Sequence, residues 1–366
     1  MKKKLLTIGL MSGTSLDGVD AALILTDGIN DIKIIDFTAK KYTPDQRSTI
    51  KTGIRLYLKN KIIKSDEVSK AGSVVTRTHI KIVQFLLKKH NLRSDQVNLI
   101  GFHGQTIYHS PKNKMTVQIG DAQELATKAK INVISSFRTK DVATGGEGAP
   151  LAPLYHQALV NKFRIKKPVC VLNIGGIANI TWVGSNNKLI AFDTGPGNFL
   201  IDQWAQKKLG RPYDKGGAHS KKGKVHNVII KNFLKHKFYE EVPPKSLETS
   251  KFDLNIVRKL STKDGFATLT ALTALSVLKG FSFLPSEPKN LILSGGGRKN
   301  KTLVNCLKSL TKATVFPIDD LGIDGDAVEA QAFAYLAVRS FKGKYLTLPT
   351  TTGVNKKTTG GIIYAK

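Results

Sequence analysis

The residues with the clearest chemical potential lie in GLMSGTSLDGVDAAL, residues 9–23, where a polar turn separates two apolar segments. Glycine lets backbone N–H groups converge on one point, and such a nest binds anions, above all phosphate. Thr14 and Ser15 add hydroxyl donors, and Asp17 adds a carboxylate that suits Mg²⁺, directly or through water. These features favour a triphosphate ligand, although a tight hairpin turn explains the same residues equally well. The residues of this candidate phosphate site are Gly13, Thr14, Ser15, Leu16, Asp17, Gly18, Val19 and Asp20.

Two further glycine-rich turns follow predicted strands. NIGGIANIT contains Gly175 and Gly176, and LSGGGRKN contains Gly295, Gly296 and Gly297 just before a predicted helix. Hairpins and other turns also use glycine, so neither turn is specific alone, but three such turns at strand ends favour a nucleotide. None matches GxxxxGK[ST], and none reads GxGxxG after a first strand, which argues against P-loop and Rossmann enzymes.

Three carboxylates stand where they can act on a bound substrate. Asp141 lies in the glycine-rich segment FRTKDVATGGEGAPLAP (137–153). Its carboxylate is either a general base or a plain turn residue. Asp193 follows a predicted strand and can bind sugar hydroxyls or Mg²⁺, with a turn role equally open. Glu329 is predicted to share the apolar face of a helix with Phe333, and a buried carboxylate needs an arginine partner or a ligand.

Other polar residues in these motifs have structural explanations. His103, in GFHGQT, ends a predicted strand and is interpreted as a structural histidine. Asp121 precedes AQELATKAK and is predicted to be a helix N-cap. Cys170 and Cys306 have no metal-ligand spacing, so we interpret them as small buried residues in a reducing compartment.

Strands and helices alternate along the chain, which predicts an α/β fold. The predicted strands are 4–10, 19–26, 32–38, 97–104, 131–137, two within 168–184, and those that open 189–206 and 290–310; the predicted helices are 66–91, 121–130, 154–163, 266–281, 326–340, one from near Asn198, and one that closes 290–310. Residues 210–263 are lysine-rich and weakly periodic. Two strand–glycine-turn–strand units, at 5–26 and 168–184, predict two similar halves facing a cleft.

Length and composition limit the function classes. With 366 residues, the chain is expected to form about two domains. The formal net charge is +30, but the lysines are scattered and no basic run alternates with aromatic residues, so we expect no nucleic-acid site. The start MKKKLLTIGLM lacks a cleavage site, and no apolar run reaches about 18 residues, so we expect a cytoplasmic protein without a membrane span.

Together these segments resemble the anhydro-N-acetylmuramic acid kinases, a family of the sugar kinase, chaperone ATPase and actin superfamily. The resemblance covers most of the chain and is weak only from about residue 215 to 263. It is carried by GLMSGTSLDGVDAAL, GFHGQTIYH, VQIGDAQELA, FRTKDVATGGEGAPLAP, NIGGIANIT, AFDTGPGN, LSGGGRKN and EAQAFAYLA. The first, fourth and sixth of these are highly specific to the family.

The resemblance implies two ribonuclease-H-like, actin-like ATPase domains flanking a central nucleotide and sugar cleft. We expect the first domain at residues 1–136, completed by about 341–366, and the second at 137–340. The implied activity is ATP-dependent phosphorylation of O6 of 1,6-anhydro-N-acetylmuramic acid, with hydrolytic opening of the anhydro bridge, in cell-wall recycling. ATP and Mg²⁺ are the implied cofactors, and a homodimer is the implied assembly.

The resemblance also assigns roles to single residues. It places the ATP phosphates on Gly13 to Asp20, makes Asp141 the catalytic base and puts Glu329 near the sugar. We take Glu329, Asp193 and Asn198 as candidate sugar-binding residues, and the other two glycine turns as nucleotide-binding. The alternatives are a kinase of another sugar and a chaperone-like or filament-forming ATP switch.

Overall fold

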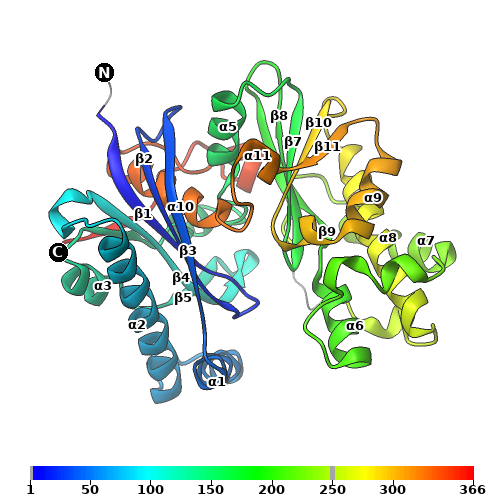
Figure 1. Ribbon diagram of the computed structural model, residues 1–366, viewed down its shortest axis with the longest axis horizontal. Coiled ribbons are helices and arrows are strands. Elements are labelled where there is room, and N and C mark those ends of the chain that lie inside the picture. Colours follow the sequence, from blue (N-terminus) through cyan, green and yellow to red (C-terminus); the bar gives the residue numbers. More distant parts are fainter. Residues whose placement is uncertain (1–2, 248–251) are drawn as a thin grey trace. The chain divides into compact units, whose positions relative to one another are not determined.

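The computed structural model describes residues 3–247 and 252–366 and divides them into two compact units (Figure 1). Unit 1 consists of the described residues up to Lys162 together with Ala327–Lys366, and unit 2 of Phe163–Asp326. The division differs from the sequence prediction, because residues 137–162 and 327–340 belong to unit 1. The chain therefore passes between the units twice, after Lys162 and after Asp326.

The sheet of unit 1 combines antiparallel and parallel pairing. Its strands are β1 (Leu5–Ser12), β2 (Gly18–Thr26), β3 (Ile32–Lys41), β4 (Leu99–Ser110), β5 (Met115–Ile119), β6 (Val133–Ser135) and β12 (Ile362–Tyr364). The order is β12-β6-β4-β1-β2-β3, with β5 paired to β4. β1, β2 and β3 are antiparallel neighbours, whereas β4 runs parallel to both β1 and β6. The last strand, β12, returns to pair with β6.

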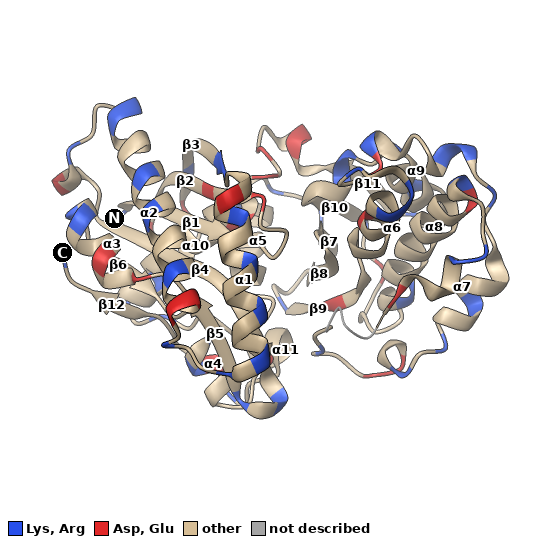
Figure 2. Ribbon diagram, turned by 90° about the horizontal axis from the view of Figure 1, so that it is seen from below, with Lys and Arg blue, Asp and Glu red and all other residues tan. Residues whose placement is uncertain are grey.

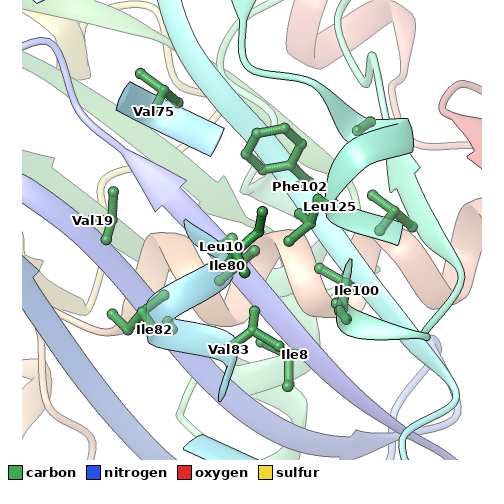
Figure 3. Close-up of a cluster of buried hydrophobic side chains, with 14 of the residues drawn as sticks. Ile8, Leu10, Val19, Val75, Ile80, Ile82, Val83, Ile100, Phe102 and Leu125 are labelled. Atoms are coloured by element: carbon green, nitrogen blue, oxygen red, sulfur yellow. The ribbon is translucent and has the colours of Figure 1, made fainter. Parts of the chain in front are cut away.

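One face of this sheet is covered by α1 (Pro44–Asn60), α2 (Asp66–Lys89) and α3 (Ala122–Ala129). Ile8, Ile100 and Phe102 alternate with residues of the other face and meet Val75 and Val83 of α2 in a buried core (Figure 3). Asp121 caps α3 by accepting a hydrogen bond from the Glu124 N–H at 2.8 Å, which confirms the predicted N-cap.

The opposite face is covered by α10 (Val328–Phe341), which lies against β1, β2 and β4. Glycines make this close approach possible. A Cβ on Gly9 would collide with the backbone of Ala330 and Ala334, and one on Gly101 would collide with the carbonyl of Phe333. α5 (Pro153–Lys162) also contacts α10, where the Tyr155 hydroxyl donates to Gln331 at 2.7 Å. Two short helices, α4 (Thr139–Ala143) and α11 (Pro349–Thr352), complete unit 1.

The sheet of unit 2 repeats this pattern. β7 (Val169–Ile174), β8 (Ile177–Val183) and β9 (Leu189–Pro196) are antiparallel neighbours, while β10 (Asn290–Ser294) runs parallel to β7 and to β11 (Thr314–Pro317). The order β11-β10-β7-β8-β9 matches β6-β4-β1-β2-β3 of unit 1. The expected α/β class with two similar sheet-containing units is therefore confirmed, and both sheets have the strand order of a ribonuclease-H-like fold.

The helices of unit 2 are α6 (Phe199–Leu209), α7 (Asn227–Phe233), α8 (Thr262–Phe281) and α9 (Lys301–Leu310). α8 and α9 pack on the sheet around Cys170, which is fully buried as predicted, whereas Cys306 on α9 is only partly buried. α6, α7 and the start of α8 form a second core around Trp204. The lysine-rich region 210–263 contains α7 and several 3-10 turns, and residues 248–251 of it lie outside the described residues.

Lys and Arg are distributed over helices and loops of both units (Figure 2). This distribution matches the scattered lysines of the sequence. Among the described residues, no helix combines the length and the apolarity needed to cross a membrane.

The contact between Gly9 and α10 yields a stability prediction. Gly9→Ala should destabilise unit 1 by about 3 kcal/mol or more, because the new methyl group has only backbone to displace. Gly72→Ala is the matched control, since its Cβ would come no closer than 3.8 Å to a neighbouring atom. In α2 that change should be neutral or stabilise by about 0.5–1 kcal/mol. Urea unfolding of both variants checks this, and equal stability of the two would contradict the packing described here.

Candidate active site

The predicted phosphate-binding segment forms the turn between β1 and β2. Thr14, Ser15 and Asp17 are exposed, while Leu16 is buried with a φ of +56°. The Leu16 N–H donates to the Gly13 carbonyl at 3.2 Å and closes the turn. A Cβ on Gly13 would meet nothing closer than the Ser15 hydroxyl at 3.8 Å. Packing among the described residues therefore does not require glycine at this position, and the place that a Cβ would take is open.

Residues that sequence reasoning missed hold the turn in place. The buried Ser12 hydroxyl donates to Oε1 of Gln105 on β4 at 2.7 Å and lies 3.0 Å from the Tyr42 hydroxyl. Burial raises the pKa of Tyr42 to about 12, so this hydroxyl stays neutral. Gly18 has a structural reason to be glycine, since a Cβ there would collide with the Lys40 carbonyl of β3. Gln105 lies in the GFHGQT motif, and this motif is the one sequence feature that could have indicated its role.

Within the described residues, Asp17 has one charge partner, Arg47 on α1. The nearest guanidinium nitrogen lies 3.6 Å from Oδ1, and the two side chains are 73% and 43% exposed. An exposed pair at this distance contributes little to stability. The same guanidinium donates to the Ser15 carbonyl at 3.0 Å, so Arg47 brings a positive charge to the turn that the sequence did not indicate.

Asp141 lies on α4, and not in a loop as predicted, with its side chain 2% exposed. Its Oδ1 accepts a hydrogen bond from the Gly148 N–H at 2.7 Å. Its Oδ2 accepts one from the Thr352 hydroxyl at 2.6 Å. A Cβ on Gly146 would collide with Oδ1, so glycine is required there for the loop to pass the carboxylate. The arrangement holds a buried carboxylate in one orientation by two donors, neither of which carries a charge.

A second set of hydrogen bonds holds the loop that follows Asp141. Arg138 donates to the Gly148 carbonyl at 2.6 Å and to Nε2 of His103 at 3.0 Å. Because the guanidinium must donate, His103 is neutral and carries its proton on Nδ1, which lies 2.9 Å from the Gly104 carbonyl. Burial, with the Arg138 charge beside it, holds the pKa of His103 well below its usual range. His103 is thus a structural histidine, as predicted.

Unit 2 brings its two glycine turns and Asn198 together. The Asn198 N–H donates to the Gly175 carbonyl at 2.8 Å, and its Nδ2 donates to the Ile174 carbonyl at 3.1 Å. A Cβ on Gly297 would lie 3.1 Å from Asn198 Oδ1 and even closer to Ile174. The two turns therefore meet at the carboxyl ends of β7 and β10, with Asn198 between them.

The glycines of these two turns are of two kinds, crowded and open. A Cβ on Gly295 would collide with the Asn173 side chain and one on Gly297 with Ile174, whereas Gly176 has nothing within 4 Å and Gly296 only Asn198 Nδ2 at 4.0 Å. The Gly176 carbonyl accepts from the N–H groups of Gly197 and Phe199, at the start of α6. Part of this glycine-rich sequence thus has a structural cause, and its nucleotide role stays a prediction.

The remaining two carboxylates differ from expectation. Asp193 lies within β9, where it is 6% exposed, and its Oδ2 accepts from the Leu247 N–H at 2.8 Å. It therefore anchors the 245–247 segment. The prediction that Glu329 lies on a buried stripe is wrong, because Glu329 is exposed at the first turn of α10. α10 is covered on several sides beyond that turn, so its apolar residues do not define a single face. The sugar-binding roles of both residues stay predictions.

Comparison with known proteins gives matches along nearly the whole chain. The family model for anhydro-N-acetylmuramic acid kinase matches residues 5–366. The curated anhydro-N-acetylmuramic acid kinase of Zymomonas mobilis is 47% identical over 365 residues, with 98% of this chain and 100% of that protein covered. That of Rhizorhabdus wittichii is 45% identical, with 99% of each chain covered. Among solved structures, the activator of the 2-hydroxyisocaproyl-CoA dehydratase from Clostridium difficile gives a TM-score of 0.47 at 14% identity, covering 93% of this chain and 96% of that one.

Buried histidines of unit 1 predict acid-sensitive stability of this unit. Burial lowers the pKa of His79, His109 and His156 to about 4, and that of His103 is lowered as well. Unfolded histidine titrates near pH 6.5, so between that pH and about 4 the unfolded state binds more protons. The histidine contribution is therefore complete above about pH 6.5 and is lost as the pH falls toward 4.

Hydrogen exchange at pH 7.5 and 5.5, corrected for intrinsic rates, measures this effect in each unit separately. Protection of α2, β4 and α5 should fall at pH 5.5 by more than protection of α8 and β7, because all four of these histidines belong to unit 1. An ordinary carboxylate titrates near pH 4, below both pH values, and therefore contributes little to the difference. An equal loss in the two units would contradict the prediction.

Proposed function

Because the chain belongs to the anhydro-N-acetylmuramic acid kinase family, we propose that it opens the 1,6-anhydro bridge of 1,6-anhydro-N-acetylmuramic acid with water and phosphorylates O6 with ATP. The products are N-acetylmuramic acid 6-phosphate and ADP, and the reaction serves the recycling of cell-wall peptidoglycan. The observation that carries the mechanism is the buried Asp141 carboxylate, whose two oxygens accept hydrogen bonds from Gly148 and Thr352.

In the proposed reaction Asp141 is the general base. Its carboxylate takes a proton from water, and the water oxygen attacks the anomeric carbon C1. The bond between C1 and the bridging oxygen breaks, and that oxygen, now O6, takes the γ-phosphoryl group from ATP. Ordinary glycoside hydrolysis needs a second carboxyl group to protonate the leaving oxygen. Here the phosphoryl group takes the place of that proton, so one carboxylate suffices.

We assign the ATP phosphates to the turn between β1 and β2. The open space beside Gly13 and the exposed hydroxyls of Thr14 and Ser15 support this assignment. Arg47 can offset the charge that develops on the phosphates during transfer. We keep the glycine turns of unit 2 as nucleotide-binding segments, and Glu329, Asp193 and Asn198 as sugar-binding residues.

The residues of the turn fit Mg²⁺. This ion usually binds proteins through one or two carboxylates and completes its shell with substrate phosphates and water. Asp17 offers one exposed carboxylate, whose contact to Arg47 is long. No group of three or more His, Cys, Asp or Glu among the described residues is arranged to hold a metal alone, so the phosphates would supply the other ligands. Bound Mg²⁺ neutralises phosphate charge.

We also propose a cytoplasmic location, as the sequence analysis expects, and a homodimer, which the family resemblance implies. The scattered Lys and Arg residues of Figure 2 support the proposal that the net charge of +30 is not a nucleic-acid site. Any binding of DNA should then be weak and fall steeply with salt. Tight sequence-specific binding at physiological salt would contradict this.

Asp141→Asn should abolish ring opening and phosphorylation together. O6 cannot accept the phosphoryl group while it bridges two carbons, so loss of the base also stops the kinase step. A general base alone contributes about 10²–10⁴ in rate, and we expect a loss at or beyond the upper end. Release of ADP and formation of the 6-phosphate, followed with the wild type and the variant, measure both steps.

Affinity for ATP provides the internal control for this variant. It should stay close to that of the wild type, because the assigned phosphate contacts lie in a different segment. Formation of the 6-phosphate within about tenfold of the normal rate would show that another residue is the base, with Glu329 as the next candidate.

Asp17→Ala should impair phosphoryl transfer without affecting the fold. The exposed pair with Arg47 contributes little, so the free energy of unfolding should change by no more than about 0.5 kcal/mol. The turnover number should fall by roughly a hundredfold or more, since the carboxylate that would hold Mg²⁺ beside the phosphates is removed. Asp320→Ala, a change at an exposed aspartate of unit 2, is the matched control and should retain activity. Normal turnover of Asp17→Ala would show that Asp17 serves only the structure of the turn.

A further inference from the structure

The C-terminal segment of the chain reaches Asp141 through a single side chain. Thr352, at the end of α11, is fully buried, and its hydroxyl donates to Asp141 Oδ2 at 2.6 Å. The Thr352 carbonyl also accepts from the Glu147 N–H at 2.6 Å. Thr352 therefore bonds both to the carboxylate and to the loop that supplies the second donor, Gly148.

The hydroxyls of the two neighbouring buried threonines, Thr351 and Thr347, do not bond to Asp141. The Thr351 hydroxyl donates to the Leu348 carbonyl and accepts from the Leu348 N–H, so it closes α11 itself. The Thr347 hydroxyl is buried and has no hydrogen-bond partner in the described part of the chain. Of these three, only Thr352 gives its proton to Asp141.

Two donors on different oxygens fix a carboxylate more completely than one. With Gly148 alone, the carboxyl group of Asp141 could rotate about its bond to Cβ, because that torsion is broad. The second donor, Thr352, is itself held firmly, since Pro349 begins α11 and Gly353 ends it with a φ of +79°. A bridge between Thr347 and Thr358 closes the base of this segment.

We infer that Thr352 is a positioning residue for the base, which orients the Asp141 carboxylate so that a free lone pair faces the attacking water. This inference rests on the proposed function, in which Asp141 activates that water. Thr352 touches neither substrate in this account and acts only through Asp141. It should therefore affect the turnover number rather than the binding of ATP or sugar.

Thr352→Val tests the inference, because it keeps the shape of the side chain and removes the donor. The turnover number should fall by roughly tenfold to a hundredfold, as misorientation of a reacting group typically costs. The KM values for ATP and for the anhydro sugar should stay within about twofold of the wild type. Thr352→Ser, which retains the hydroxyl, should restore most of the turnover.

Thr347→Val is the matched control, since it makes the same change at a buried threonine of the same segment without loss of a hydrogen bond. It should leave turnover unchanged and unfold at the same temperature as the wild type or above it. If Thr352→Val fails to fold, thermal unfolding reveals this, and Thr352→Ala and Thr352→Ser then provide the comparison. Turnover that follows stability in all variants, with no rescue by serine, would overturn the inference.

A double variant separates positioning of the base from any other role. In the Asp141→Asn background, the added Thr352→Val change should have no further effect on the residual rate, because both changes remove the same function. Independent, multiplicative losses would overturn the inference. If the wild type is active and Thr352→Val keeps full turnover, the inference about Thr352 is overturned and the proposed function stands. A wild type that forms no 6-phosphate would overturn the proposed function, and the inference with it.

Discussion

The carboxylate of Asp141 is buried and yet keeps its oxygens in a defined orientation, because two uncharged donors bind it from separate segments. A buried carboxylate without such donors would be costly. A directly paired arginine would neutralise it and make it a poor base. The hydrogen bonds from Gly148 and Thr352 avoid both outcomes. The structure of unit 1 brings these two donors to one point from positions more than 200 residues apart.

The return of the C-terminal segment to unit 1 is what makes this possible. α10 enters unit 1 directly after the crossing at Asp326 and lies close to β1 and β4, where Gly9 and Gly101 leave room for its backbone. After α10 the chain forms α11 and then β12, which pairs with β6. β6 leads into Arg138 and α4. Asp141 and Thr352 are thus both positioned by segments that lead to or from the same edge of the sheet, β6 and β12.

Local patterns predicted local features well. The N-cap of Asp121, the structural role of His103, the buried strand around Cys170 and the repeated strand–turn–strand units all follow from residue type and spacing over short distances. The sequence analysis does not predict α1, although Thr43 and Gln46 form a capping box that marks its start.

Features that depend on distant contacts could not be predicted in this way. Nothing near Thr352 in sequence indicates that its hydroxyl reaches Asp141, and nothing near Ser12 indicates Gln105 as its partner. The buried stripe predicted for Glu329 requires a helix that is covered on one face only. α10 is covered on several sides, and its first turn, which carries Glu329, is the exposed part.

Isotope incorporation tests most directly the claim that an aspartate-activated water opens the bridge as O6 is phosphorylated. With ATP and 1,6-anhydro-N-acetylmuramic acid in ¹⁸O water, mass spectrometry of the wild-type product should show one ¹⁸O at the anomeric hydroxyl. O6 and the transferred phosphoryl group should carry none. Unlabelled N-acetylmuramic acid 6-phosphate kept in the same water corrects for exchange at the anomeric carbon. A product without label beyond that exchange, or with label at O6, would contradict the account.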